Sequence, residues 1–119
     1  MAGTVHLPWY ATGFRHDELA VELERISKVS LRYGASSHIV YRSRDDRYKF
    51  LQIIDFDEKL DFERYWLGPE MIDFRTNCQG WFQVPIVYVW HDTVVAGTGP
   101  GPRSDAGGKA ATPVAAKTT

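Results

Sequence analysis

The chain has 119 residues, of which 44% are hydrophobic and 13% aromatic, with a formal net charge of -1. This length suits one ordinary globular domain. The near-neutral charge argues against nucleic acid as a partner, because phosphate binding needs a concentrated basic surface. The single cysteine, Cys78, excludes an intrachain disulfide. We find no signal-peptide pattern and no apolar run of membrane-spanning length, so we expect a cytoplasmic protein without a membrane partner.

The N-terminal third predicts a strand followed by a helix. In residues 5–14 apolar and polar positions alternate with strand spacing, and Pro8 favours an edge position or a bulge. Asp17 is the expected N-cap of a helix that ends at Gly34. The apolar positions of this helix recur at helical spacing: Leu19, Leu23, Ile26, Ser30 and Tyr33.

The middle and last thirds predict a hairpin, a broken helix and a final strand. Residues 38–42 and 48–56 are rich in β-formers and flank a polar loop over 43–47. Asp57 is the expected cap of a helix to about Leu67, and the run 68–70 (Gly-Pro-Glu) restarts the helix, which ends at Gly80. Residues 84–95 predict a long buried strand.

The order β-α-β-β-α-β predicts an α+β, ferredoxin-like fold, with a four-stranded antiparallel sheet and both helices on one face. We expect the folded domain to span residues 3–96. Residues 97–119 are rich in Gly, Pro and Ala and lack aromatic residues, so a disordered tail is predicted.

The predicted sheet is apolar on both faces. In the third strand Phe50, Ile54 and Phe56 lie on one side, and Leu51 and Ile53 on the other. The helices can cover only one face, and an exposed apolar sheet favours association. A homodimer that pairs sheet to sheet is therefore predicted.

Three stretches resemble the antibiotic biosynthesis monooxygenase-like family of dimeric α+β barrels. They are residues 50–56 (FLQIIDF), residues 62–75 (FERYWLGPEMIDFR) and residues 80–82 (GWF), followed by an apolar strand. The resemblance covers residues 38–95 by pattern and residues 5–34 by element order. It implies a cleft between helices and sheet in which oxygen oxidises an aromatic compound without a protein-bound cofactor. Trp66 matches a Trp of haem-degrading relatives, but Thr76 stands where they need a histidine, which disfavours haem degradation.

Oxidation of a phenol to a quinone needs a proton acceptor and polar groups that hold the developing anion. We take His38 and His91 as the catalytic candidates and expect four side chains to bind substrate: Trp66, Tyr10, Tyr41 and Arg75. His6 is a further candidate base. A purely structural role is the alternative for each of them, and for Arg75 that role is an ion pair with Glu63 or Asp73. The four histidines and Cys78 are scattered, so no metal site is predicted. The family resemblance implies that no cofactor is needed.

Two functions stay open. The first is a small-molecule-binding, cofactor-independent monooxygenase-like protein that acts on an aromatic or polyketide-like compound. The second is a non-enzymatic dimerisation or regulatory module of the same fold. Residues 47–56 loosely resemble an RNA-recognition strand but lack its glycines, so RNA binding is the less favoured form of the second.

Overall fold

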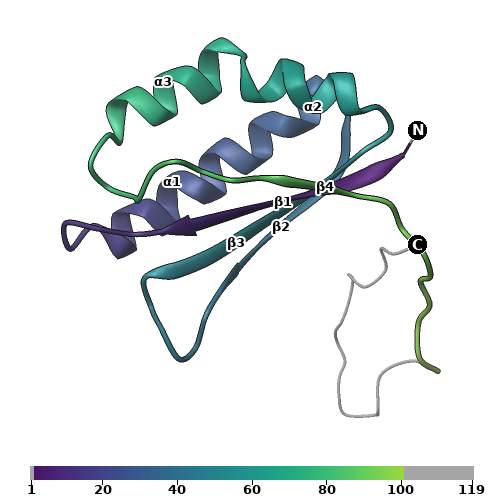
Figure 1. Ribbon diagram of the computed structural model, residues 1–119, viewed down its shortest axis with the longest axis horizontal. Coiled ribbons are helices and arrows are strands. Elements are labelled where there is room, and N and C mark those ends of the chain that lie inside the picture. The colour runs from purple at the N-terminus through teal and green to yellow at the C-terminus, as the bar shows by residue number, and fades with distance from the viewer. Residues whose placement is uncertain (1, 101–119) are drawn as a thin grey trace.

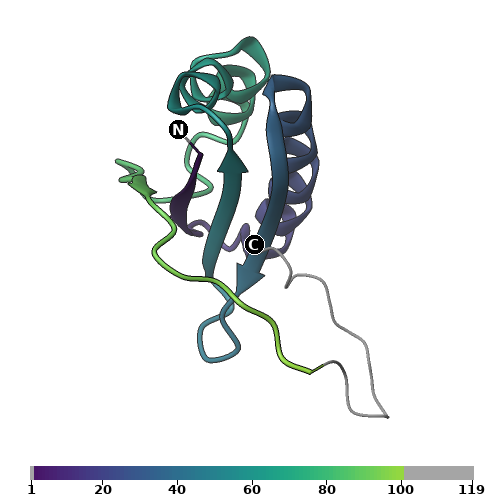
Figure 2. The same ribbon diagram turned by 90° about the vertical axis from the view of Figure 1, so that its right-hand side faces the viewer.

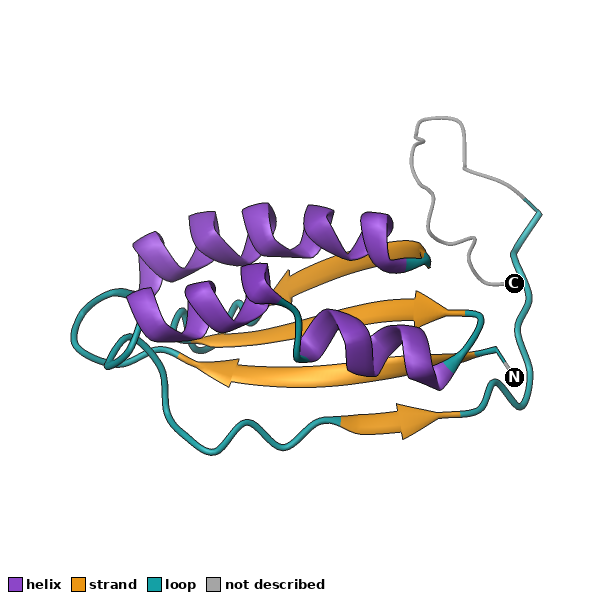
Figure 3. Ribbon diagram, turned by 90° about the horizontal axis from the view of Figure 1, so that it is seen from above, coloured by secondary structure: helices purple, strands orange, loops and turns teal. Residues whose placement is uncertain are grey.

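The computed structural model describes residues 2–100. A four-stranded antiparallel sheet has the strand order β2-β3-β1-β4, with the helices on one face (Figures 1 and 3). This confirms the predicted α+β, ferredoxin-like fold. From residue 101 onward, the predicted tail lies outside the described residues. The elements are β1 (Gly3–Tyr10), α1 (His16–Val29), the 3-10 helix η1 (Ser30–Tyr33), β2 (Ala35–Arg42), β3 (Lys49–Phe56), α2 (Lys59–Trp66), α3 (Pro69–Asn77) and β4 (Val89–His91).

Alternation in β1 and β3 divides the sheet into two faces, as the sequence predicted. Val5, Leu7 and Trp9 are buried beneath the helices, and so are Phe50 and Ile54. Cross-strand neighbours share a face. The register therefore places the alternate residues, whose side chains point away from the helices, on a second face that we call the outer face. Its members include His6, Pro8, Tyr10, Ile39, Tyr41, Leu51, Ile53, Val89 and His91.

Helix α1 has the expected buried side but begins differently. Its apolar positions are buried, and the chain leaves η1 at Gly34 with φ 99°, a left-handed conformation that favours glycine. The N-cap is Arg15 rather than Asp17, and no side chain caps the helix. Asp17 lies in the first turn, where it accepts a hydrogen bond from Arg42, so a tertiary partner has replaced the local one.

The broken second helix follows the prediction, apart from its cap. Helix α2 begins after Glu58 rather than Asp57, whereas Pro69 is the first residue of α3, as expected. The break at Gly68 is tightly packed, because a Cβ atom there would lie 2.6 Å from the Tyr33 hydroxyl oxygen and 2.8 Å from the Arg64 carbonyl oxygen. A side chain at this position has no room.

The predicted strand over residues 84–95 is wrong in length, because β4 spans only Val89–His91. Phe82 bridges to Ala11 and Val89 pairs with His6. Between these two pairs the chain takes seven residue steps, from 82 to 89, whereas the opposite stretch takes five, from 11 to 6. The two extra residues push residues 84–88 away from β1. Pro85, which lacks an N–H group, lies in this segment. The part of β1 that faces this segment contains Pro8, and at Pro8 β1 pairs only with β3.

Helix α1 runs beside the edge strand β2, while α2 and α3 lie over the central strands of the sheet (Figures 2 and 3). Much of the core beneath α2 and α3 is aromatic: Trp9 makes edge-to-face contacts with Phe74 and Phe82, with ring centroids 5.5 and 5.0 Å apart. The described part of the chain contains no helix with the length and apolar character needed to cross a membrane.

Candidate functional site

A cleft with a volume of about 410 Å³ lies between α1 and the edge strand β2. This volume is within the range of small-molecule sites. Apolar side chains from α1, β2 and β3 supply much of the lining, and four polar side chains join them. The lining residues are Ala20, Glu24, Ser27, His38, Ile39, Val40, Arg42 and Phe50.

His38 lies half-buried in the cleft, on the same face of β2 as Val40 and Arg42. Burial lowers the pKa of His38, and the positive charge of Lys28 lowers it further. The imidazole is therefore held neutral at physiological pH, and a neutral imidazole accepts a proton from a ligand.

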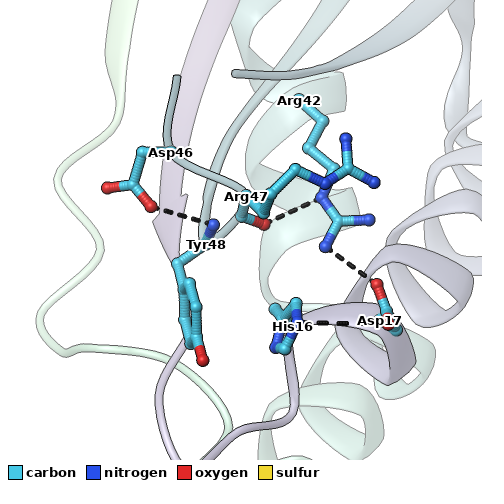
Figure 4. A network of polar contacts seen from close by, with 6 residues as sticks. All are labelled: His16, Asp17, Arg42, Asp46, Arg47 and Tyr48. Atoms are coloured by element: carbon cyan, nitrogen blue, oxygen red, sulfur yellow. Dashed lines mark hydrogen bonds and ion pairs between the residues drawn. The ribbon is translucent and has the colours of Figure 1, made fainter. Parts of the chain in front are cut away.

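Arg42 is fixed at the hairpin end of the cleft by contacts from three directions. Its Nε donates to the Arg47 carbonyl oxygen at 2.8 Å, and its Nη2 donates to Asp17 Oδ1 at 2.9 Å (Figure 4). Its guanidinium carbon lies 5.0 Å from the centre of the Phe50 ring. The hydrogen bond from Arg42 lowers the pKa of Asp17, which keeps this partner ionised. The cation is thus held in one orientation beside an aromatic wall.

Neighbouring side chains of the hairpin support this arrangement. Tyr48 stacks on His16 with ring centroids 4.3 Å apart, and its backbone N–H donates to Asp46 Oδ1 at 3.0 Å (Figure 4). His16 Nε2 lies 4.0 Å from Asp17 Oδ2. The start of α1 and the β2–β3 loop are therefore held together next to Arg42.

Beneath the cleft lies a buried network of polar groups. The Trp9 indole N–H donates to Gln52 Oε1 at 3.0 Å, and Gln52 Nε2 donates to Ser27 Oγ at 2.9 Å and to the Tyr65 hydroxyl at 3.4 Å. The Tyr65 hydroxyl donates to the Ile26 carbonyl oxygen at 2.7 Å. Burial raises the pKa of Tyr65, so its phenol stays protonated. Ser27 connects this network to the cleft.

Two of the predicted substrate-binding residues, Trp66 and Arg75, lie together but away from the cleft. The Arg75 guanidinium carbon is 4.0 Å from the centre of the Trp66 ring, and Arg75 Nη2 donates to the Trp66 carbonyl oxygen at 2.9 Å. Arg75 Nη1 is buried and lacks a partner within residues 2–100. The expected ion pair with Glu63 or Asp73 is therefore wrong for the described chain. Burial lowers the pKa of Arg75.

The other ring contacts of Trp66 explain why the cleft does not lie beside it. Its ring centroid is 5.5 Å from that of Tyr88, 6.2 Å from that of Phe62 and 6.3 Å from that of Trp9. These neighbouring rings and Arg75 pack against Trp66, whereas the cleft is lined by residues of α1, β2 and β3.

The remaining candidates lie on the outer face. His91 packs against His6 with ring centroids 4.2 Å apart. The Tyr10 hydroxyl donates to Asp46 Oδ2 at 2.8 Å, and Tyr41 is 54% exposed. Of the six predicted site residues, the structure therefore brings only His38 into the cleft.

Sequence reasoning missed Ser27, Arg42 and Gln52. Gln52 carries a recognisable signal, since it is a polar residue at a core-facing position of an otherwise apolar strand. Arg42 carries none, because its charged partner, Asp17, lies 25 residues away in the sequence. Within residues 2–100 there is no group of three His, Cys, Asp or Glu side chains that could hold a metal ion.

No protein-family model matches the sequence, and no curated protein matches it. Solved structures do match. A candidate antibiotic biosynthesis monooxygenase from Nitrosomonas europaea has a TM-score of 0.70 at 13% identity, covering 78% of this chain and 90% of that one. SnoaB, a cofactor-independent oxygenase from Streptomyces nogalater, crystallised as a mutant, has a TM-score of 0.68 at 17% identity, covering 83% and 97%. The fold implied by the sequence resemblance is thereby confirmed.

Proposed function

We propose that the chain binds a small hydroxylated aromatic compound in the cleft between α1 and β2 and oxidises it with molecular oxygen, without a cofactor. The observation that carries this proposal is the pairing of a neutral His38 with a fixed Arg42 in one largely apolar cleft. The likeness to a cofactor-independent oxygenase supports the reaction class at the level of the fold.

In this proposal His38 takes the phenolic proton, and Arg42 stabilises the phenolate, which is richer in electrons than the phenol. The phenolate reduces oxygen. The ring gains one oxygen atom and loses two hydrogens to become a quinone, and the second oxygen atom leaves as water. Phe50 and Val40 supply apolar contacts for the ring.

The test is oxygen uptake and quinone absorbance during incubation with 1-naphthol or 1,8-dihydroxyanthrone. We expect oxygen-dependent turnover that His38→Asn lowers by about a hundred-fold, within the range for general-base catalysis. His91→Asn is the matched control, because His91 lies on the outer face. Turnover that survives His38→Asn, or that falls equally in both variants, contradicts the assignment of His38.

We further propose that two copies pair through their outer faces. Ile39, Leu51 and Ile53 are half-exposed there, and Tyr41 and Val89 are exposed. Light scattering is expected to give twice the chain mass, and Ile53→Lys to give one chain mass with an unchanged far-ultraviolet spectrum. A monomeric unmodified chain at micromolar concentration contradicts the pairing.

The same outer face favours the second candidate function, a non-enzymatic dimerisation module. A dimeric protein that shows neither turnover nor a ligand-induced rise in Tm with the aromatic panel would support this second function over the first.

A further inference from the structure

In the buried network beneath the cleft, the Trp9 indole determines which groups donate hydrogen bonds and which accept them. An indole N–H is a donor only, so Gln52 must turn its carbonyl oxygen Oε1 toward Trp9. The amide NH₂ of Gln52 then points toward Ser27 and Tyr65. One donor-only group therefore orients the whole amide.

The hydroxyl groups of Ser27 and Tyr65, which accept these bonds, differ in the hydrogen bonds that they themselves donate. The Tyr65 hydroxyl donates a hydrogen bond to the Ile26 carbonyl oxygen at 2.7 Å. Ser27 Oγ accepts from Gln52, and within residues 2–100 its O–H finds no acceptor. Ser27 is only 1% exposed, and it lines the cleft. A buried hydroxyl proton without an acceptor is unfavourable, so a group in the cleft is the acceptor it lacks.

We infer that Ser27 is a recognition residue that donates a hydrogen bond to an oxygen of the bound aromatic compound, and that Gln52 is the positioning residue that keeps Ser27 a donor. The ligand class is an aromatic compound with an acceptor oxygen, either an ionised phenol or a quinone carbonyl. This inference rests on the proposed function for the place of the ligand. It adds which atom of the ligand the floor of the cleft recognises.

His38 and Arg42 line the same cleft as Ser27, so recognition of an oxygen anion by Ser27 is consistent with the proposed reaction. A phenol that loses its proton to His38 becomes an anion, and that anion is the acceptor that Ser27 and Arg42 both favour. In the proposed complex the ligand oxygen accepts the hydrogen bond that the Ser27 hydroxyl donates.

The probe is 4-nitro-1-naphthol, whose ionised form has its own visible absorption band. We expect the apparent pKa of the bound dye to lie below that of the free dye. Ser27→Ala should move it back toward the free value and weaken binding of the anion by about ten-fold to a hundred-fold, as for a hydrogen bond to a charged group. Ser27→Thr, which keeps the hydroxyl, should restore most of the effect.

Gln52→Glu tests the positioning role directly. Burial at this position, which is 0% exposed, raises the pKa of the introduced carboxyl group, so the variant is compared above the pH at which that group ionises. The carboxylate then accepts from Trp9 with one oxygen and from Ser27 with the other, so Ser27 would turn its proton away from the cleft. The dye is then expected to behave as in Ser27→Ala, although the serine is present. Far-ultraviolet circular dichroism reports whether the variant is folded, and Ser27→Ala carries the test if Gln52→Glu is not.

An equal dye pKa and affinity in the unmodified chain and in Ser27→Ala would overturn the inference. It would leave the proposed function standing if oxygen turnover still depends on His38. Failure of the dye to bind the unmodified chain at millimolar concentration would also overturn the inference. Loss of His38-dependent turnover alone would sink the proposed reaction and leave oxygen recognition by Ser27 intact.

Discussion

Replacing Gln52 with leucine tests how much the buried network contributes to stability. Leucine keeps a similar volume but cannot accept the Trp9 N–H, which then lies buried without a partner. An orphaned buried donor costs about 1–3 kcal/mol, and the lost bonds to Ser27 and Tyr65 add roughly 1 kcal/mol. We expect the free energy of unfolding to fall by about 2–4 kcal/mol, and Tm by about 10 °C or more for a domain of this size.

The partner substitution separates the hydrogen bond from packing. Trp9→Phe removes the donor and leaves Gln52 Oε1 without its partner. In the double variant neither group is orphaned, so its loss should be smaller than the sum of the two single losses by about 1–2 kcal/mol.

Urea unfolding followed by far-ultraviolet circular dichroism measures these losses, at one fixed protein concentration so that any dimer contributes equally. The matched control is Gln79→Leu, because Gln79 is exposed and should change stability by about 0.5 kcal/mol or less. A Gln52→Leu variant as stable as this control would refute the reasoning, and additive losses in the cycle would show that Trp9 and Gln52 do not act as a pair.

Two further predictions concern pH and a close backbone contact. Burial and Lys28 lower the pKa of His38 below 6.5 in the folded chain, so the unfolded chain binds the proton more tightly and stability is lost as pH falls through 6.5. Urea unfolding at about pH 7.5 and about pH 5.5 should show a smaller drop for His38→Asn, and an equal drop contradicts the cause. A Cβ atom at Gly3 would lie 2.6 Å from the Trp90 ring, so Gly3→Ala should cost about 1–3 kcal/mol and red-shift the tryptophan emission. Gly97→Ala meets nothing within 4 Å and should leave both unchanged; an effect there of the same size would show that the contact is not the reason.

Where a residue's neighbours in the sequence determine its structure, the sequence predicts the fold well. Alternation in β1 and β3 and the spacing of Leu19 and Leu23 each reflect one local period. Pro69 likewise begins α3 because its missing N–H is harmless there. The predicted cap at Asp17 was wrong, because Asp17 bonds to a distant partner, Arg42, which no local pattern reveals.

The predicted length of the last strand was wrong for a tertiary reason. Its apolar residues suit a strand, yet pairing also depends on the number of residues opposite them on β1, and two extra residues break the register. Tyr88 then contacts Phe62, whereas Val87 stays 63% exposed. Composition describes each residue's preference for burial, but register decides which residues are buried.

The prediction of the site residues was largely wrong for the same reason, and the reason indicates which residues are more informative about function. Residue types suited to catalysis pointed to six side chains, of which only His38 lies in the cleft. The more informative residue was Gln52, a polar side chain where the strand pattern demands an apolar one. A buried amide must satisfy its hydrogen bonds, so a glutamine at this position of the sequence implies buried donors and acceptors around it, which are Trp9 and Ser27 in the fold. In this chain those partners lead directly to the floor of the cleft.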